Sequence, residues 1–410
     1  MNRILRLLSF CVFFIILSLY GCTSIRIASK GPAAYPENRL ERNDFSVSRG
    51  GNVIGRLATV RLEDGDTLPD MARHFGVGVN AISAANPGVD IWAPKAGTRI
   101  ILPLSFILPD TKKGIVINLD AMRLFHFKGN SVSTYPVGIG AKDRPTPMGQ
   151  MYVTHKIVRP TWHVPASIAE DHRKKGDPLP TIVPPGPLNP LGEYALYLSK
   201  PTYLIHGTNK PASIGLNATN GCIRLYPEHI GKLYTTAQVR TPVSIVHQPY
   251  LIGRRGKVIY LEVHTPPEDS GKVYAQLQNM EKRYGRTLDW QRVEEALTEA
   301  RGIPIPLSGT CKEIEVTHPE KLYGAPEIPE LTRGWYILAA NANDRTDAVR
   351  LAAIINHQGP QIPATVMSTH DKHRVIAGPF TNISEAKEAK KRLKIDLEID
   401  GIVVEPAGKQ

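Results

Sequence analysis

Residues 111–248 alternate between apolar and polar positions with the period of two that is typical of β-strands. Two such runs, 114–119 and 123–127, are separated by a short turn and predict an antiparallel hairpin. Loops that contain glycine and proline follow at 138–149 and 178–190. The pattern predicts a domain of mainly β structure over 111–248.

Residues 56–104 form a second, much shorter unit. An alternating run at 59–62 predicts a first strand, and 98–102 predicts a closing strand. Between them lie two amphipathic runs, which predict short helices at 67–75 and 79–85, and the polar turn before the first run is expected to supply its cap. A core of this size is marginal, so we expect a small and regular α+β fold of the order β-α-α-β.

Residues 330–407 show a third pattern, in which strands and helices are mixed. Strands are predicted at 335–340, 364–368, 374–378 and 402–404, and helices at 346–357 and 384–393. The order β-α-β-β-α-β is that of ferredoxin-like α+β folds.

The remaining segments are less regular. Residues 23–55 are polar and lack periodicity, which predicts a tether. An extension at 249–329 begins with a predicted strand and two amphipathic helices and ends in a Pro-rich stretch, 302–329, that we interpret as a linker. The predicted strand lies at 258–263, and the helices lie at 271–284 and 289–300.

The first 22 residues carry the pattern of an export signal. Arg3 and Arg6 precede an apolar run at 7–20, which is short for a membrane-spanning helix. The run leads into Leu-Tyr-Gly-Cys, which resembles a bacterial lipobox, and this resemblance implies a lipidated Cys22 as the mature N-terminus. Because Thr23 rather than aspartate follows, it also implies anchoring to the outer membrane. An ordinary membrane anchor or a conventionally cleaved signal remains an alternative.

Charge and composition narrow the class of partner. The 410 residues carry a formal net charge of +12, which favours polyanions such as nucleic acid, anionic lipid or an acidic cell-wall polymer. Export disfavours nucleic acid. Hydrophobic residues make up 42% and charged residues 21% of the chain, which are globular values that exclude a fibrous or disordered protein.

One stretch contains residue types suited to nucleophilic chemistry. Cys222 follows a glycine that allows a tight turn, and His206 lies 16 residues upstream at the end of an apolar run. If the chain reverses direction between the two residues, the imidazole could lie beside the sulfur and act as a base. The backbone N–H groups of Gly221 and Cys222 could hold an oxyanion, and Arg224 offers a planar fork for a substrate carboxylate.

Taken alone, this pair proves little, because a lone cysteine is more often a small core residue. A zinc site is disfavoured, since neither a Cys-x-x-Cys motif nor a spaced histidine pair lies near Cys222. A disulfide between Cys222 and Cys311 is an alternative in an oxidising compartment. We interpret Cys222 as a free thiol and assign no function to Cys311.

The motifs around the pair resemble those of YkuD-type L,D-transpeptidases. His-Gly-Thr at 206–208 and Gly-Cys-Ile-Arg-Leu at 221–225 are similar to the active-site motif of that family. Further similar segments lie at 138–149, 161–165 and 184–192. The resemblance covers about residues 111–248 and implies a mainly β, sandwich-like catalytic fold.

The resemblance implies a peptidoglycan L,D-transpeptidase that needs no metal or organic cofactor. In that family the cysteine attacks a tetrapeptide stem, releases D-Ala and passes the acyl group to an amine on another stem or on an envelope lipoprotein. Carried over here, Cys222 is the nucleophile, His206 the general base, Gly207 the carbonyl that orients it, and Gly221 an oxyanion N–H. The implied substrate-binding residues are Arg224, Thr208 and Asn220.

One position departs from the family pattern. Many members have Ser-His-Gly-Cys where this chain has Thr-Asn-Gly-Cys at 219–222. If a histidine at position 220 were the essential base, this chain would be inactive; with His206 as the base, Asn220 can still hydrogen-bond a carbonyl. Two other functions therefore stay open, namely a non-catalytic peptidoglycan tether and a cysteine peptidase that acts on stem peptides.

Two flanking resemblances indicate the same polymer. Residues 56–104 resemble a LysM domain, which implies binding of N-acetylglucosamine-containing glycan. Gly-Trp-Tyr-Ile-Leu at 334–338 and Arg-Val-Ile-Ala-Gly-Pro-Phe at 374–380 resemble a SPOR domain, which implies binding of glycan strands. We therefore expect a multi-domain lipoprotein of the periplasm, with peptidoglycan and the outer membrane as its partners.

Overall fold

The computed structural model describes residues 42–48, 50–310, 312–369 and 372–405. The export signal with Cys22 and the unassigned Cys311 lie outside these described residues. Within them, no helix combines the length and the apolar character that crossing a membrane requires.

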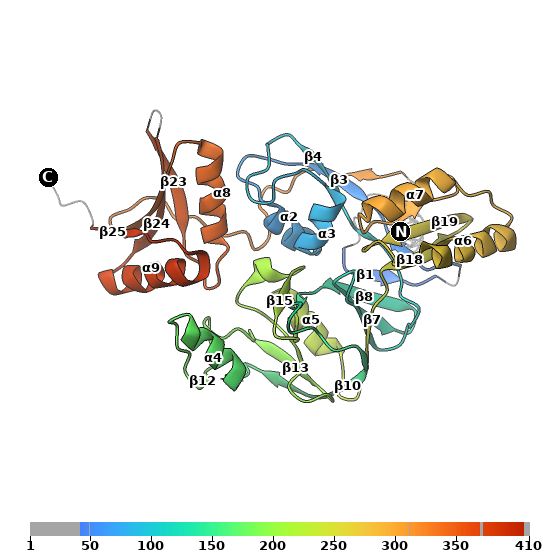
Figure 1. The fold of residues 1–410 in the computed structure, drawn as a ribbon, viewed down its shortest axis with the longest axis horizontal. Coiled ribbons are helices and arrows are strands. Elements are labelled where there is room, and N and C mark those ends of the chain that lie inside the picture. The colour runs from blue at the N-terminus through green and yellow to red at the C-terminus, as the bar shows by residue number, and fades with distance from the viewer. Residues whose placement is uncertain (1–41, 49, 311, 370–371, 406–410) are drawn as a thin grey trace, which may run out of the picture. The chain divides into compact units, whose positions relative to one another are not determined.

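A nine-stranded sheet forms the centre of the predicted β domain (Figure 1). Its strands follow the order β1 (Asp44–Ser46), β8 (Ser131–Pro136), β7 (Arg123–Lys128), β6 (Ile115–Asn118), β17 (Pro242–Val246), β10 (Gly149–Val158), β13 (Tyr194–Leu198), β14 (Leu204–His206) and β16 (Ile223–Arg224). The predicted hairpin is confirmed, since β6 and β7 pair antiparallel. At the sheet edge, β14 and β16 pair in parallel.

This parallel edge pair positions the site. Ile205 and Ile223 lie opposite each other on β14 and β16, and both are buried in the main core together with residues of helix α5 (Pro227–Thr236). Successive side chains on a strand point to opposite faces. The side chains of His206 and Arg224, the next opposed pair, are therefore directed away from that core.

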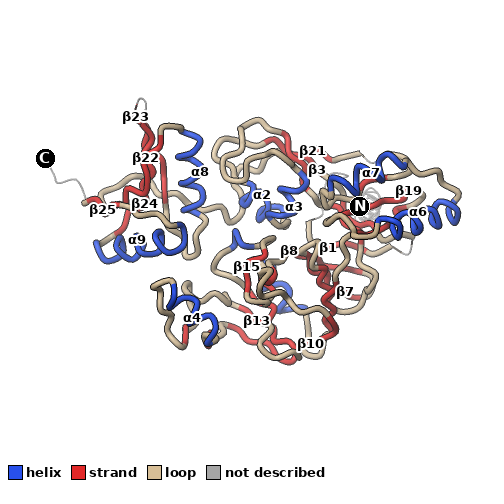
Figure 2. Tube along the Cα trace, in the orientation of Figure 1, coloured by secondary structure: helices blue, strands red, loops and turns tan. Residues whose placement is uncertain are grey.

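A small insertion separates β10 from β13. Strands β11 (Trp162–His163) and β12 (Ile182–Val183) pair antiparallel, and helix α4 (Ala166–Lys174) lies between them in the chain. No residue of α4 is buried, so this helix is not held by a hydrophobic face. Figure 2 shows α4 as a short helix flanked by loops. Two further short strands, β9 (Ile139–Gly140) and β15 (Asn217–Thr219), pair in parallel, and a 3-10 turn, η1 (Pro211–Ser213), precedes β15.

The predicted tether is wrong for its described part. Strand β1 extends the nine-stranded sheet, and β2 (Val53–Gly55) pairs with β5 (Ser105–Ile107). Phe45 and Ile54 are buried in one cluster with aromatic residues of the neighbouring strands. These strands are only three residues long, so they leave no periodicity that a sequence pattern would reveal.

The N-terminal unit follows the predicted order β-α-α-β. Its elements are β3 (Ala58–Arg61), α2 (Leu68–Phe75), α3 (Val79–Ala85) and β4 (Arg99–Leu102), with β3 and β4 antiparallel. The cap differs from the prediction, because the side chain of Thr67 accepts from the Asp70 backbone at 3.2 Å. Asp66, in the preceding turn, instead pairs with His318 at 2.9 Å.

The extension after the sheet contains β18 (Tyr250–Arg255), β19 (Val258–Val263), α6 (Ser270–Tyr284) and α7 (Trp290–Glu299). The Pro-rich stretch after them is not a free linker, which corrects the prediction. Its strand β20 (Ile305–Pro306) pairs with β19, and β21 (Ile314–Glu315) adds in parallel to β3. Proline is compatible with strands at a sheet edge, so composition alone could not exclude this pairing.

The C-terminal unit has the predicted order β-α-β-β-α-β. Its elements are β22 (Trp335–Ala342), α8 (Arg345–Asn356), β23 (Ala364–Thr369), β24 (Lys372–Phe380), α9 (Ile383–Leu397) and β25 (Ile402–Val404). The strands form an antiparallel sheet in the order β23-β24-β22-β25, on which both helices pack (Figure 1).

Candidate active site

Cys222 lies immediately before β16, at the end of a tight turn. Gly221 has a φ of 97°, which L side chains rarely adopt, and a Cβ there would come within 2.7 Å of the Tyr203 ring. The thiol donates to the Thr202 carbonyl at 3.5 Å. The glycine is thus required by both backbone conformation and space, and it fixes where the sulfur stands.

Burial raises the pKa of the Cys222 thiol, although a hydrogen bond from the Leu204 backbone and the charge of Arg224 act in the opposite direction. The sulfur is therefore held as a neutral thiol at rest. Its nucleophilic form requires a base that removes the proton during attack.

His206 ends β14 and is 3% exposed. Burial, followed by the charge of Arg224, lowers the pKa of its imidazole to about 3, so the ring is neutral at pH 7 and able to accept a proton. In the strand register His206 stands opposite Arg224, and Cys222 immediately precedes that strand. The Leu204 backbone, which hydrogen-bonds the thiol, lies two residues before His206 on β14.

Gly207 is predicted to orient the His206 imidazole through its backbone carbonyl. The backbone carbonyls of Gly207 and Leu191 raise the pKa of His206 by hydrogen bonding, but less than burial lowers it. Nδ1 nevertheless makes no hydrogen bond of ordinary geometry. Orientation of the imidazole by Gly207 stays a prediction.

Arg224 carries a positive charge that no group in the described part of the chain neutralises. Its Nε is buried without a hydrogen-bond partner, and no carboxylate in the described part of the chain pairs with its guanidinium. Burial lowers its pKa, while the neighbouring Cys222 has the opposite effect. A cation that is partly removed from water and lacks a partner is costly, so the site favours an anionic group that pairs with Arg224.

Two predicted site residues have their hydrogen-bonding atoms engaged elsewhere. The Gly221 N–H donates to the Thr219 hydroxyl at 3.1 Å, and its role as an oxyanion donor stays a prediction. Thr208 is 4% exposed, and its hydroxyl accepts from the Lys210 backbone at 2.9 Å. Thr208 therefore stabilises a turn, and its part in substrate binding stays a prediction.

Asn220 is exposed, two residues before Cys222, as its predicted substrate role requires. The structure adds two residues to which the sequence assigned no role, and Arg144, in the similar segment 138–149, is the first. Arg144 donates to the Asn220 side chain and also pairs with Asp171 of α4. Burial raises the pKa of the Tyr197 hydroxyl, and the neighbouring Cys222 acts in the same direction.

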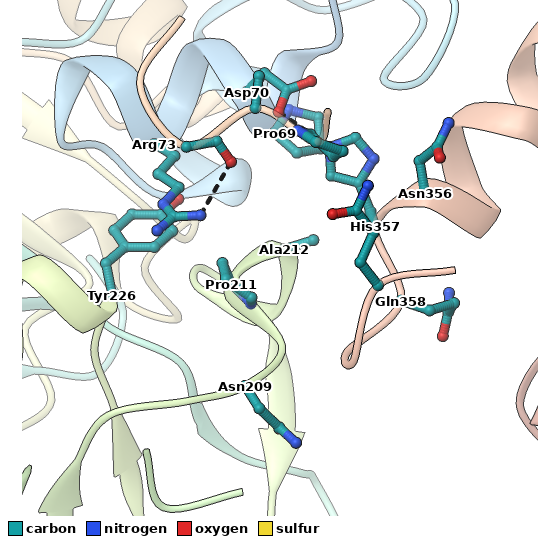
Figure 3. A pocket seen from close by; sticks show the side chains of 14 residues that line it. Pro69, Asp70, Arg73, Asn209, Pro211, Ala212, Tyr226, Asn356, His357 and Gln358 are labelled. Carbon is teal, nitrogen blue, oxygen red and sulfur yellow. Dashed lines mark hydrogen bonds and ion pairs between the residues drawn. The ribbon is translucent and has the colours of Figure 1, made fainter. Parts of the chain in front are cut away.

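A cavity of about 160 Å³ elsewhere in the described chain does not contain Cys222 or His206 (Figure 3). Its charged side chains are already paired within the protein. Asp70 accepts from the Thr67 hydroxyl at 2.6 Å and pairs with His357 at 3.1 Å, while Arg73 binds Glu228 and the Gly324 carbonyl. This cavity therefore offers no unpaired charged group to a ligand.

Comparisons with known proteins match two segments to families. Residues 112–245 match the YkuD model, described as the L,D-transpeptidase catalytic domain, and residues 331–405 match the SPOR domain. The chain is similar to the "Probable L,D-transpeptidase ErfK/SrfK" of Escherichia coli, with 36% identity over 65% of this chain and 90% of that protein. It is also similar to the "Probable L,D-transpeptidase YbiS" of Escherichia coli, with 40% identity over 53% and 73%.

Solved structures give partial matches. The catalytic domain of an Enterococcus faecium L,D-transpeptidase is matched over its full length and over 34% of this chain, with 20% identity and a TM-score of 0.27. L,D-transpeptidase 1 of Mycobacterium tuberculosis is matched over 68% of its chain and 36% of this one, with 21% identity and a TM-score of 0.23. An Enterococcus faecium crystal structure is matched over 50% of its chain.

Proposed function

The chain belongs to the L,D-transpeptidase family and is an L,D-transpeptidase, and from that premise we propose that Cys222 is the residue acylated during the reaction. One observation carries the proposal. A half-buried thiol immediately precedes β16, the neighbouring strand β14 ends in a buried, neutral imidazole, and an unpaired guanidinium stands opposite that imidazole.

The protonation states determine the first half of the reaction. As the sulfur attacks the stem-peptide carbonyl, His206 takes the thiol proton, and a sulfur–carbon bond forms. Collapse of the tetrahedral intermediate breaks the carbon–nitrogen bond, and His206 returns the proton to the nitrogen of the leaving D-Ala. An acceptor amine then attacks the thioester and loses a proton to His206, a carbon–nitrogen bond forms, and the carbon–sulfur bond breaks as His206 returns the proton to the sulfur of Cys222.

Arg224 is proposed to bind a carboxylate of the stem peptide. Its guanidinium lacks an internal anion, and a charge-assisted pair with substrate would replace solvation that burial removed. The formal net charge of +12 supports attraction of anionic stems over a longer range.

The flanking units are proposed to hold the enzyme on its polymer. The SPOR domain at 331–405 and the β-α-α-β unit, which resembles LysM, would each bind peptidoglycan glycan. A lipidated Cys22 would anchor the protein to the outer membrane in the periplasm. Several attachments together raise the local concentration of stem peptides at the enzyme, even if each attachment is weak. The acceptor is an amine on another stem or on an envelope lipoprotein.

The test uses the full purified chain with tetrapeptide muropeptides, followed by mass spectrometry of products and intact protein. We expect loss of D-Ala, an acyl adduct on the peptide that contains Cys222, and cross-linked dimers. Free tripeptide without cross-links in the presence of an acceptor amine would support the peptidase alternative. A folded protein with neither adduct nor D-Ala release would support the non-catalytic tether.

A further inference from the structure

A polar network connects Asn220, two residues before Cys222, with helix α4. Arg144, in the loop after β9, donates to the side-chain oxygen of Asn220 at 2.5 Å and also pairs with Asp171 on α4. The Arg144 and Asp171 side chains are 35% and 38% exposed. Ion pairs this exposed contribute little to stability, so the network's effect is to be sought in positioning.

The contact fixes how the Asn220 amide points. A guanidinium only donates hydrogen bonds, so it selects the amide oxygen and turns the NH2 group away from itself. In the described part of the chain that NH2 group donates to no protein acceptor, and Asn220 is exposed. A free donor is thus held two residues before the nucleophile.

The backbone that carries Arg144 is itself fixed against the nucleophile turn. Ala141 donates its N–H to the Thr219 carbonyl at 2.8 Å, and Arg144 donates its N–H to the Ala141 carbonyl at 3.0 Å. The next carbonyl, that of Pro145, stands 3.3 Å from where a Cβ on Gly221 would lie. The loop and the turn therefore move together, and the Arg144 side chain spans a short, defined gap.

We propose that Arg144 is a positioning residue: held by Asp171, it orients the Asn220 amide so that its NH2 group donates to a peptide carbonyl of the acyl-donor stem beside the scissile bond. The inference rests on the proposed function and deepens it. With His206 as base, position 220 needs a donor of fixed direction rather than a second imidazole. Asp171, which holds Arg144, lies on α4, a helix without buried residues.

A double-mutant cycle tests the relay. R144A and N220A should each lower kcat/KM for D-Ala release by about tenfold, the scale of a hydrogen bond that involves a charged group. Because Arg144 acts through Asn220, the double variant should be no worse than N220A alone. D171N should have a smaller effect, about threefold, because Arg144 keeps its Asn220 contact.

The chain offers matched controls. K142A removes a positive charge from the same loop at an exposed residue outside the network, and E170Q alters a carboxylate on α4 that pairs with Arg173 at 2.7 Å. Both should retain kcat/KM within about twofold. R144K should recover part of the R144A loss, since lysine supplies a charge and donors but not the planar fork.

A second readout does not depend on turnover. The Asn220 side-chain NH2 signal in ¹⁵N NMR, assigned by its disappearance in N220A, should be well dispersed in the unaltered protein and collapse toward the free-amide position in R144A. Equal signals in both proteins would overturn the relay, as would additive kinetic losses in the double variant. Absence of D-Ala release together with the expected NMR change would refute the proposed function while the orienting role of Arg144 stands.

Discussion

The two sides of the site are built by different means. The inner side carries Cys222, His206 and Arg224 on or beside β14 and β16, in front of the buried Ile205 and Ile223. The outer side consists of Asn220, Arg144 and Asp171, which are joined by exposed side-chain contacts. Strand register fixes the inner side, whereas the outer side depends on a few charges.

The inner side determines the protonation of the reacting groups, and the outer side determines how nearby groups are oriented. Burial on the inner side changes protonation, since it keeps the imidazole neutral and the thiol protonated. The outer side is too exposed for such effects and can only orient groups. Substitutions on the inner side are therefore expected to remove activity or stability, and those on the outer side to change rates by smaller factors.

The largest effect is expected for Cys222→Ala. Removing the sulfur removes the acyl-enzyme, so D-Ala release should fall by at least about 1,000-fold. The measurement is D-Ala release with the intact mass of the protein, and an unchanged melting temperature confirms folding. Retained turnover in C222A would refute the nucleophile.

The next effect is expected for His206→Asn. Loss of the base should lower kcat roughly 100-fold to 10,000-fold, because asparagine cannot accept the thiol proton. Steady-state kinetics at high substrate concentration measure this, with the pH raised to ionise the thiol directly. Partial recovery at alkaline pH is expected, and a full rate at neutral pH would exclude His206 as the base.

Gly221→Ala tests the turn that joins the two sides. The added Cβ would meet the Tyr203 ring at 2.7 Å in a backbone conformation with φ of 97°, so the turn must shift and displace the sulfur. We expect about a tenfold or larger loss of kcat/KM, since small misplacements of a nucleophile are costly. Gly231→Ala is the matched control, because its Cβ would make ordinary contact with Tyr194 at 3.6 Å. Equal activity of both variants would contradict the steric argument.

The last prediction concerns stability in acid rather than reaction rate. Burial lowers the pKa of His206 and His229 to about 3 and that of His126 to about 4 in the folded state, below the unfolded value near 6.5. Their contribution to stability is complete above about pH 6.5 and is lost as pH falls through the folded values. By pH 5 each of the three histidines lowers the free energy of unfolding by on the order of 2 kcal/mol.

Calorimetric unfolding at pH 7 and pH 5 measures this loss. The melting temperature should fall with acid, and H206N should lose less between the two pH values than the unaltered chain. R144A should lose as much as the unaltered chain, since the exposed outer side does not contribute to this titration. An identical loss in H206N would show that the imidazole does not titrate as burial requires.

Local patterns in the sequence predicted most of the fold. Strands of five or more residues and amphipathic helices repeat their apolar positions often enough to be recognised, as in β7, β24 and α6. The strands β1, β2, β20 and β21 are two or three residues long, and partners far away in the chain stabilise them. The predicted tether and linker are wrong for that reason.

The sequence by itself determined the reactive groups: a cysteine after a glycine, an upstream histidine, and an arginine two residues beyond the cysteine. Only the tertiary structure decided their protonation and their hydrogen-bond partners. Burial set the protonation of His206, a hydroxyl occupied the Gly221 N–H, and Arg144 reached Asn220 across 76 positions of chain. Charge and shape in a site depend on which strands are neighbours, and that is a property of the sheet rather than of any segment.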